Sequence, residues 1–246
     1  MYTEYFQSIV NVSNGSGWYA SNNTRTEMEW LTKEYPENKK TFKQILNQYN
    51  RIKNGKVHFL QIGAMDGVKH DELHHYIKNN PWEGVLVEPL PDMFERLSQN
   101  YQDNPRLMFV CSAIADTDGP AVMHRIPVEK LQDSDVPDWA EGCSTMVTEG
   151  YFDDLMTHMV KETVNGITLK TLYEEYGDKY DFVQVDTEGF DYNIFLQLQT
   201  AGLTADIYKI EIAHITYNKT VWMRWVLDNQ GYKTFIDGYD LIAYRF

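Results

Sequence analysis

The sequence predicts an α/β fold in which seven strands form one mostly parallel sheet with helices on both faces. From residue 57 onward, short apolar runs alternate with polar stretches of helical length, a pattern typical of parallel strands and their crossover helices. The last two runs are separated by four residues, too few for a crossover helix, so we expect an antiparallel C-terminal hairpin. With 246 residues and 43% apolar side chains, the chain can form one large core.

The individual elements follow from this alternation in chain order. Each predicted strand is an apolar run bounded by turn residues, and the polar stretches between most of these runs are long enough for helices. The predicted strands cover residues 57–63, 84–88, 107–115, 180–186, 205–213, 232–236 and 241–244. The predicted helices cover residues 71–79, 92–101, 192–200 and 219–229.

Two segments fall outside this alternation. Residues 1–55 begin with a stretch rich in Asn, Ser, Gly and Thr and then turn helical, so we expect an N-terminal helical cap on a domain that covers residues 56–246. Residues 116–166 hold eleven acidic side chains against three basic ones. A connection of that length inside a domain is usually a functional lid or a disordered excursion. Its aromatic residues favour a substrate lid.

Charge and composition narrow the range of partners. The formal net charge of −14 argues against a nucleic-acid partner or an anionic membrane, both of which require clustered Lys and Arg. The two cysteines form no metal or disulfide framework, and no apolar stretch is long enough to span a bilayer. The first residues lack the pattern of a secretory signal, so the sequence predicts a cytoplasmic protein with no membrane partner.

The first predicted strand ends in a glycine turn, Gly63-Ala64-Met65-Asp66-Gly67, and the second ends in Glu88-Pro89. Glycines let backbone N–H groups approach a ligand, and a carboxylate at the next strand end can accept hydrogen bonds from both hydroxyls of a ribose. This pair of features predicts a site for a nucleoside cofactor. An ordinary turn between a strand and a helix, with an aspartate capping the helix, is the structural alternative.

The spacing of the glycines indicates which cofactor is bound. A dinucleotide site needs G-x-G-x-x-G, and this turn has no third glycine at the required position. Asp66 and Asp71 beside the turn suit a ligand that carries an ammonium and a sulfonium better than a pyrophosphate. The turn therefore favours S-adenosylmethionine over NAD.

Carboxylates end the two strands predicted at 180–186 and 205–213. Asp186 follows an apolar run at the point where a bound cofactor would meet the sheet, and Asp191 is placed to cap the next helix. Glu211 and His214 end the neighbouring strand and could face the same cleft. Asp186, Glu211 and His214 are therefore the candidates for a catalytic base. A packing role for His214 stays open, as does a divalent cation held by Asp186, Glu188, Glu211 and His214.

Together these segments resemble FkbM-type methyltransferases in order and spacing. The resemblance rests on five segments: residues 60–67, 86–89, 112–119, 143–146 and 185–191. It implies a class I, Rossmann-like methyltransferase sheet, S-adenosylmethionine as cofactor, and O-methylation of a hydroxyl, commonly on a sugar or secondary metabolite. By this resemblance Gly63, Ala64 and Gly67 border the methionine part, Glu88 binds the ribose, and Ser112 and Ala113 lie near the adenine.

The chain departs from the usual pattern of class I methyltransferases at Gln61, where an acidic residue is common. The amide can still accept a hydrogen bond, but it carries no charge. The complete predicted cofactor site consists of Gln61, Gly63, Ala64, Asp66, Gly67, Asp71, Glu88, Pro89, Ser112 and Ala113.

The sequence thus predicts an S-adenosylmethionine-dependent O-methyltransferase that acts on a small-molecule or carbohydrate acceptor. Two alternatives stay open. One is an NAD-linked oxidoreductase on a similar sheet, against which the missing glycine and the closing hairpin both count. The other is a catalytically silent scaffold that binds the cofactor, which Gln61 favours. The sequence leaves the acceptor and the oligomeric state open.

Overall fold

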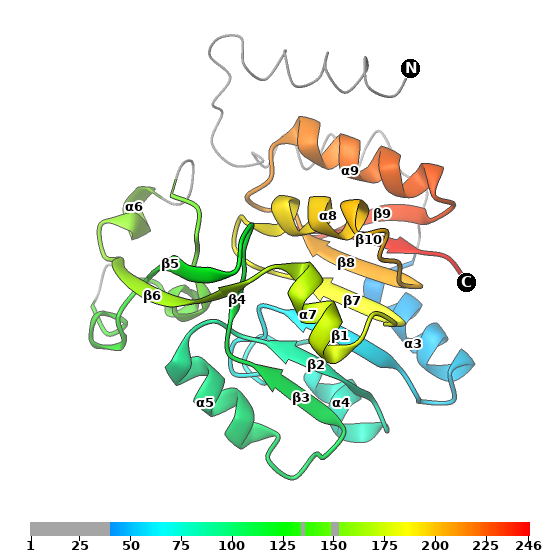
Figure 1. The fold of residues 1–246 in the computed structure, drawn as a ribbon, viewed down its shortest axis with the longest axis horizontal. Coiled ribbons are helices and arrows are strands. Elements are labelled where there is room, and N and C mark those ends of the chain that lie inside the picture. The colour runs from blue at the N-terminus through cyan, green and yellow to red at the C-terminus, as the bar shows by residue number, and fades with distance from the viewer. Residues whose placement is uncertain (1–39, 134–135, 149–152) are drawn as a thin grey trace.

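The computed structural model describes residues 40–133, 136–148 and 153–246 (Figure 1). Most of the predicted N-terminal cap, residues 1–39, lies outside the described residues. So do six residues of the predicted lid, 134–135 and 149–152.

The main sheet has seven strands in the order β3-β2-β1-β7-β8-β10-β9. Its first five strands pair in parallel, and β10 is antiparallel to both of its neighbours, β8 and β9. The predicted α/β sheet with an antiparallel C-terminal hairpin is therefore confirmed. The strands are β1 (His58–Ile62), β2 (Glu83–Val87), β3 (Leu107–Val110), β7 (Phe182–Val185), β8 (Ile207–Glu211), β9 (Lys233–Asp237) and β10 (Asp240–Tyr244).

Helices cover both faces of this sheet, and each face has its own apolar core. The side chains of β1 alternate between the two: Leu60 and Ile62 pack towards α7, α8 and α9, whereas Phe59 packs towards α3, α4 and α5. Burial on both faces explains why the central strands are almost continuously apolar. The helices are α3 (Phe42–Ile52), α4 (His74–Asn79), α5 (Pro91–Asn100), α7 (Leu169–Tyr176), α8 (Asp191–Thr200) and α9 (Tyr217–Asn229).

Helix α3 begins at a capping box. The Thr41 hydroxyl accepts a hydrogen bond from the N–H of Gln44, and the Gln44 side chain accepts one from the N–H of Thr41. Phe42, Ile45 and Tyr49 are buried against the sheet. Within the described residues, the C-terminal end of the expected cap thus packs directly on the face of the main sheet.

The third predicted strand, 107–115, is wrong as a single element. The chain leaves the main sheet after Val110, and β4 (Ala113–Ile114) belongs to a second sheet of order β4-β6-β5. Ser112 lies at this break, where its hydroxyl accepts a hydrogen bond from Asn165 at 2.9 Å. The sequence is apolar across this break because both end residues of β3 are buried in the main sheet and β4 is buried in the second sheet.

The second sheet occupies much of the segment expected to be a lid. Its other strands, β5 (Gly119–Arg125) and β6 (Val160–Ile167), pair antiparallel and lie to one side of the main sheet (Figure 1). Between them lie two short 3-10 helices, η1 (Val128–Lys130) and η2 (Asp138–Gly142), and α6 (Asp153–Met156). Among the described residues, no helix combines the length and the apolar character needed to cross a membrane.

Candidate active site

A cavity of about 290 Å³ lies at the carboxyl ends of β1, β2 and β7. Parallel strands bring their carboxyl ends to one edge of the sheet, which is where ligands bind in open α/β folds. The second sheet and the η2 segment contribute the opposite wall, through residues such as Met123, Gly142 and Met146. Nine of the predicted site residues line this cavity: Gln61, Gly63, Ala64, Asp71, Glu88, Pro89, Ser112, Ala113 and Asp186.

Gly63 allows the ends of β1 and β7 to approach closely. Its φ is +84°, in the left-handed region, and a Cβ at this position would overlap the carbonyl oxygen of Asp186. The N–H of Gly63 donates to Val87 at 3.0 Å, and the N–H of Asp186 donates to Ile62 at 3.0 Å. The bare backbone of Gly63 therefore forms part of the cavity floor.

Glu88 is buried, with both carboxylate oxygens facing backbone donors. Its Oε2 accepts from the N–H of Met65 and its Oε1 from the N–H of Leu90, each at 2.9 Å. Met65 reaches this position with a left-handed φ of +48°. Burial raises the pKa of Glu88 to about 7, although the two N–H groups favour the ionised form. Each oxygen keeps a second lone pair for a ligand hydroxyl.

Two buried amide side chains line the cavity. Gln61 and Gln184 are neighbours on β1 and β7, and both are almost fully buried. The Oε1 atom of each has no hydrogen-bond partner among the described residues. Burial raises the pKa of nearby Asp71 to about 6, although the N–H of Leu73 donates to its carboxylate. Buried acceptors without donors fit a ligand that carries N–H groups, such as an ammonium.

Gln184 is a cavity residue that sequence reasoning missed. The available signal was a polar side chain inside the apolar run Phe182-Val183-Gln184-Val185, in a strand predicted to be buried on both faces.

Two predicted cofactor residues, Asp66 and Gly67, do not line the cavity. The carboxylate of Asp66 accepts hydrogen bonds from the N–H groups of Val68 and Lys69, which closes a local turn. Gly67 has a φ of +72°, and a Cβ there would clash with Leu97 and Tyr101 of the neighbouring helical segment. The structure thus gives both residues a role in shaping the turn, and a contact with the cofactor stays a prediction.

Asp186 lines the cavity at the end of β7. Burial raises its pKa well above the usual range, and the charges of Glu188 and Asp191 add to the effect, whereas Lys209 opposes it. Asp191 is the first residue of α8 and accepts hydrogen bonds from the N–H groups of Thr187 and Gly189, each at 2.9 Å. The expectation that Asp191 caps the helix is therefore wrong, because its carboxylate turns back to hold the loop after β7.

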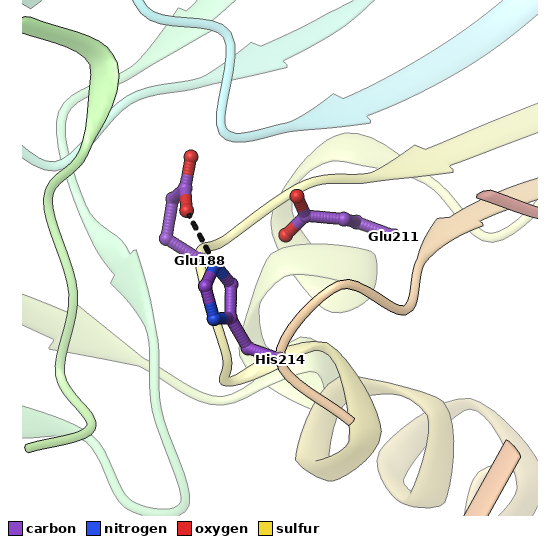
Figure 2. Close-up of side chains that lie close together, drawn as sticks. All are labelled: Glu188, Glu211 and His214. Carbon is purple, nitrogen blue, oxygen red and sulfur yellow. Dashed lines mark ion pairs between the residues drawn. The ribbon is translucent and has the colours of Figure 1, made fainter. Parts of the chain in front are cut away.

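Glu188 of this loop lies close to Glu211 and His214 (Figure 2). One donor atom from each lies within 4.8 Å of the other two, and His214 Nε2 is 3.2 Å from Glu188 Oε2. Glu188 has a left-handed φ of +55° and is the member of the three that lines the cavity. Burial raises the pKa of Glu211 well above its usual value, and the charge of Asp186 raises it further.

Ion pairs connect the η2 segment, which lines one wall of the cavity, to the loop after β1 and to α5. Glu141 lies 2.5 Å from Lys69 Nζ, in the loop after β1, and 2.8 Å from Arg96 of α5. Beyond η2, the Thr145 hydroxyl donates to the carbonyl oxygen of Glu188 at 2.7 Å. The segment from η2 to Thr145 is therefore connected to the loop after β1, to α5 and to the loop after β7.

The sequence profile of the Methyltransferase FkbM domain matches residues 61–234, which is most of the chain. The chain belongs to the FkbM methyltransferase family. This confirms the resemblance seen in the sequence, and it assigns the domain to the S-adenosylmethionine-dependent methyltransferases. No curated protein matches the chain at a significant level.

Several solved structures are similar to parts of this FkbM-family chain. Methyltransferase FkbM from Methylobacillus flagellatus KT is 12% identical, with a TM-score of 0.47, over 77% of this chain and 44% of its own. The METTL16 MTase domain is 14% identical, with a TM-score of 0.43, over 82% and 67%. Aeropyrum pernix fibrillarin, solved with natively bound S-adenosyl-L-methionine, is 9% identical, with a TM-score of 0.40, over 76% and 65%.

Proposed function

We propose that this protein transfers a methyl group from S-adenosylmethionine to a hydroxyl of a sugar, polysaccharide or secondary metabolite. The observation that carries the proposal is a single cavity that connects the Gly63 turn and Glu88 with Asp186 and Glu188. The residues proposed to bind the nucleoside, and Asp186 with its raised pKa, thus line the same cavity.

The residues of the cavity fit the cofactor part by part. Glu88 can accept the ribose hydroxyls through the free lone pairs of its buried carboxylate. Asp71 and the amide oxygens of Gln61 and Gln184 supply acceptors for the methionine ammonium. Ser112 and Ala113, with the apolar side chains of Met93 and Met123, form a surface for the adenine.

When bound, S-adenosylmethionine supplies a methyl group on a positively charged sulfur, and the sulfur keeps the bonding electron pair when the methyl leaves. The protein's own task is to hold the acceptor oxygen in line with that methyl and to take up its proton. We assign the proton to Asp186, because it lines the cavity and because its raised pKa makes it a stronger base than an ordinary carboxylate. Glu211 and His214 lie next to Glu188 and are not among the residues that line the cavity.

Calorimetry with S-adenosylhomocysteine tests the cofactor assignment. We expect a stoichiometry of one and a dissociation constant in the micromolar range or below. Folded protein that releases no heat at high micromolar ligand would exclude the proposal.

A second experiment tests the role of Asp186. Asp186→Asn should retain S-adenosylhomocysteine binding and lose methyl transfer from labelled S-adenosylmethionine to a panel of mono- and oligosaccharides. The exposed Asp103 offers a matched control, because Asp103→Asn makes the same chemical change outside the cavity. Transfer that survives in Asp186→Asn would remove this residue as the base, and it would leave the cofactor assignment intact.

We further propose that residues 116–166 form the lid that selects the acceptor. Met123, Glu141 and Met146 of this segment line the cavity opposite the ends of the strands. The acceptor would therefore lie between this segment and the carboxylates of Asp186 and Glu188, which follow β7.

A further inference from the structure

We propose that Glu188, Glu211 and His214 bind a divalent cation of the Mn²⁺ and Mg²⁺ class beside the methyl-transfer site (Figure 2). Binding of the ion is independent of the proposed function, whereas its role in orienting an acceptor rests on that function. From the sequence alone, four residues were possible ligands of a divalent cation: Asp186, Glu188, Glu211 and His214. The structure brings three of those residues together, and Asp186 is not part of the cluster.

The geometry of the cluster suits a single ion. The three donor atoms lie within 4.8 Å of one another, and they come from the loop after β7, the end of β8 and the turn before α9. Ligands on opposite sides of an octahedral Mg²⁺ or Mn²⁺ lie about 4.2 Å apart, from metal–oxygen distances near 2.1 Å. Neighbouring ligands of such an ion lie about 3.0 Å apart, so rotations of the three side chains would draw their donor atoms together around one centre.

Glu211 supplies a second and independent observation. Its Oε2 is a buried oxygen with no hydrogen-bond partner in the described part of the chain. Glu211 lies between Ile210 and Ile212 at the end of a central strand, where a carboxylate is costly unless it has a partner. Figure 2 shows this carboxylate directed towards Glu188 and the His214 ring. A cation between the three would provide the missing partner.

The neighbouring charges also favour a cation. Lys209, on the same face of β8, is already shared between Asp240 at 3.3 Å and Glu72 at 3.4 Å. Because Lys209 already forms ion pairs with these two carboxylates, it compensates the charges of Glu211 and Asp186 only in part. A divalent ion would balance the carboxylates that gather at the ends of β7 and β8.

The ligand types indicate which ion is bound. Two carboxylates prefer hard divalent ions, and one imidazole shifts the preference from Mg²⁺ towards Mn²⁺. Three protein ligands leave up to three positions open in an octahedral site. Glu188 lines the cavity, so at least one of these positions can face an acceptor. Two adjacent oxygens, as in a vicinal diol, are the acceptor chemistry that such a site would orient.

Titration of Mn²⁺ into the full chain, followed by the loss of the free-ion EPR signal, tests the inference. We expect one ion per chain. Glu211→Gln and His214→Gln should each weaken binding at least about 30-fold, because each replaces a strong ligand with a neutral amide that binds the ion less tightly. Glu174→Gln removes one carboxylate from the exposed surface of α7 and should leave binding unchanged. Absence of binding at millimolar Mn²⁺, or equal affinity in all four proteins, would overturn the site.

Calorimetry with S-adenosylhomocysteine in EDTA separates this inference from the proposed function. The two ligand variants should retain S-adenosylhomocysteine affinity, which also shows that they are folded. Proteins that bind S-adenosylhomocysteine but not Mn²⁺ would refute the cation site alone. Proteins that bind Mn²⁺ but not S-adenosylhomocysteine would refute the methyltransferase proposal alone.

Discussion

At the scale of single residues, the shape of the cavity depends on Gly63, for two separable reasons. Its left-handed φ of +84° is strained for any other residue, and a Cβ would overlap backbone at Asp186 rather than a movable side chain. Gly231 has nearly the same φ, +86°, and open space at the Cβ position. This pair of glycines therefore separates conformational strain from steric overlap.

Gly63→Ala should lower the free energy of unfolding by about 3 kcal/mol or more, because the ends of β1 and β7 must move apart. Gly231→Ala should cost about 1 kcal/mol, the effect of the left-handed backbone alone. Urea denaturation followed by circular dichroism measures both. Equal losses in the two variants would mean that the strand ends are not in the close contact described.

Glu88 is the residue on which nucleoside binding should depend most. Glu88→Gln replaces one acceptor oxygen with an N–H₂ group, which cannot accept a hydrogen bond from Met65, Leu90 or a ribose hydroxyl. We expect S-adenosylhomocysteine affinity to fall about 10-fold to 100-fold, or roughly 1.4 to 2.8 kcal/mol. Glu83→Gln, at the exposed start of β2, the strand that precedes Glu88, is the control. Unchanged affinity in Glu88→Gln would place the ribose elsewhere.

At the scale of elements, the ion pairs that connect η2 to Lys69 and Arg96 should control how fast the cofactor enters and leaves the cavity. Lys69 and Arg96 are each 42% exposed, so their ion pairs with Glu141 contribute little to stability. Glu141→Gln should change the free energy of unfolding by less than about 1 kcal/mol. It should nevertheless speed the dissociation of S-adenosylhomocysteine several-fold, which stopped-flow displacement measures. A dissociation rate equal to that of the wild type would show that the pairs do not hold the segment closed.

The strands show which parts of the fold can be predicted from sequence patterns. Six of the seven strands of the main sheet were predictable as single elements, because each buries apolar side chains on both faces and ends at a glycine or a polar residue, whereas β3 was predicted only as part of a longer run. The break between β3 and β4 was not predictable, because it depends on pairing between Ala113 and Gly166, far along the chain. Helix α7 also lay outside the prediction, although Thr168 caps its start.

The same limit applies to the candidate site. Gly63, Glu88 and Asp186 were visible in the sequence, because each is an exception to an apolar strand at its carboxyl end. The cluster of Glu188, Glu211 and His214 became specific only when β7 and β8 were placed side by side. Side chains that act together from different elements are set by the register of the sheet, and no local pattern encodes that register.

At the scale of the whole molecule, buried carboxylates should make stability depend on pH in an unusual direction. Burial raises the pKa of Glu88 to about 7 and of Asp71 and Asp191 to about 6, all above the values of unfolded carboxyl groups. Between pH 4 and pH 7 the folded chain therefore binds more protons than the unfolded chain. Stability must then fall as the pH rises through this window.

We expect the free energy of unfolding to be greater at pH 5.5 than at pH 7.5 by a few kcal/mol, since one pKa unit corresponds to about 1.4 kcal/mol. Urea denaturation at both pH values in buffer with EDTA measures this difference. The net charge of −14 acts in the same direction through general repulsion, but 1 M salt screens that part. A difference that persists in 1 M salt and shrinks in Glu88→Gln comes from the buried groups. A difference that disappears in salt would assign the effect to net charge, and it would contradict the raised pKa of Glu88.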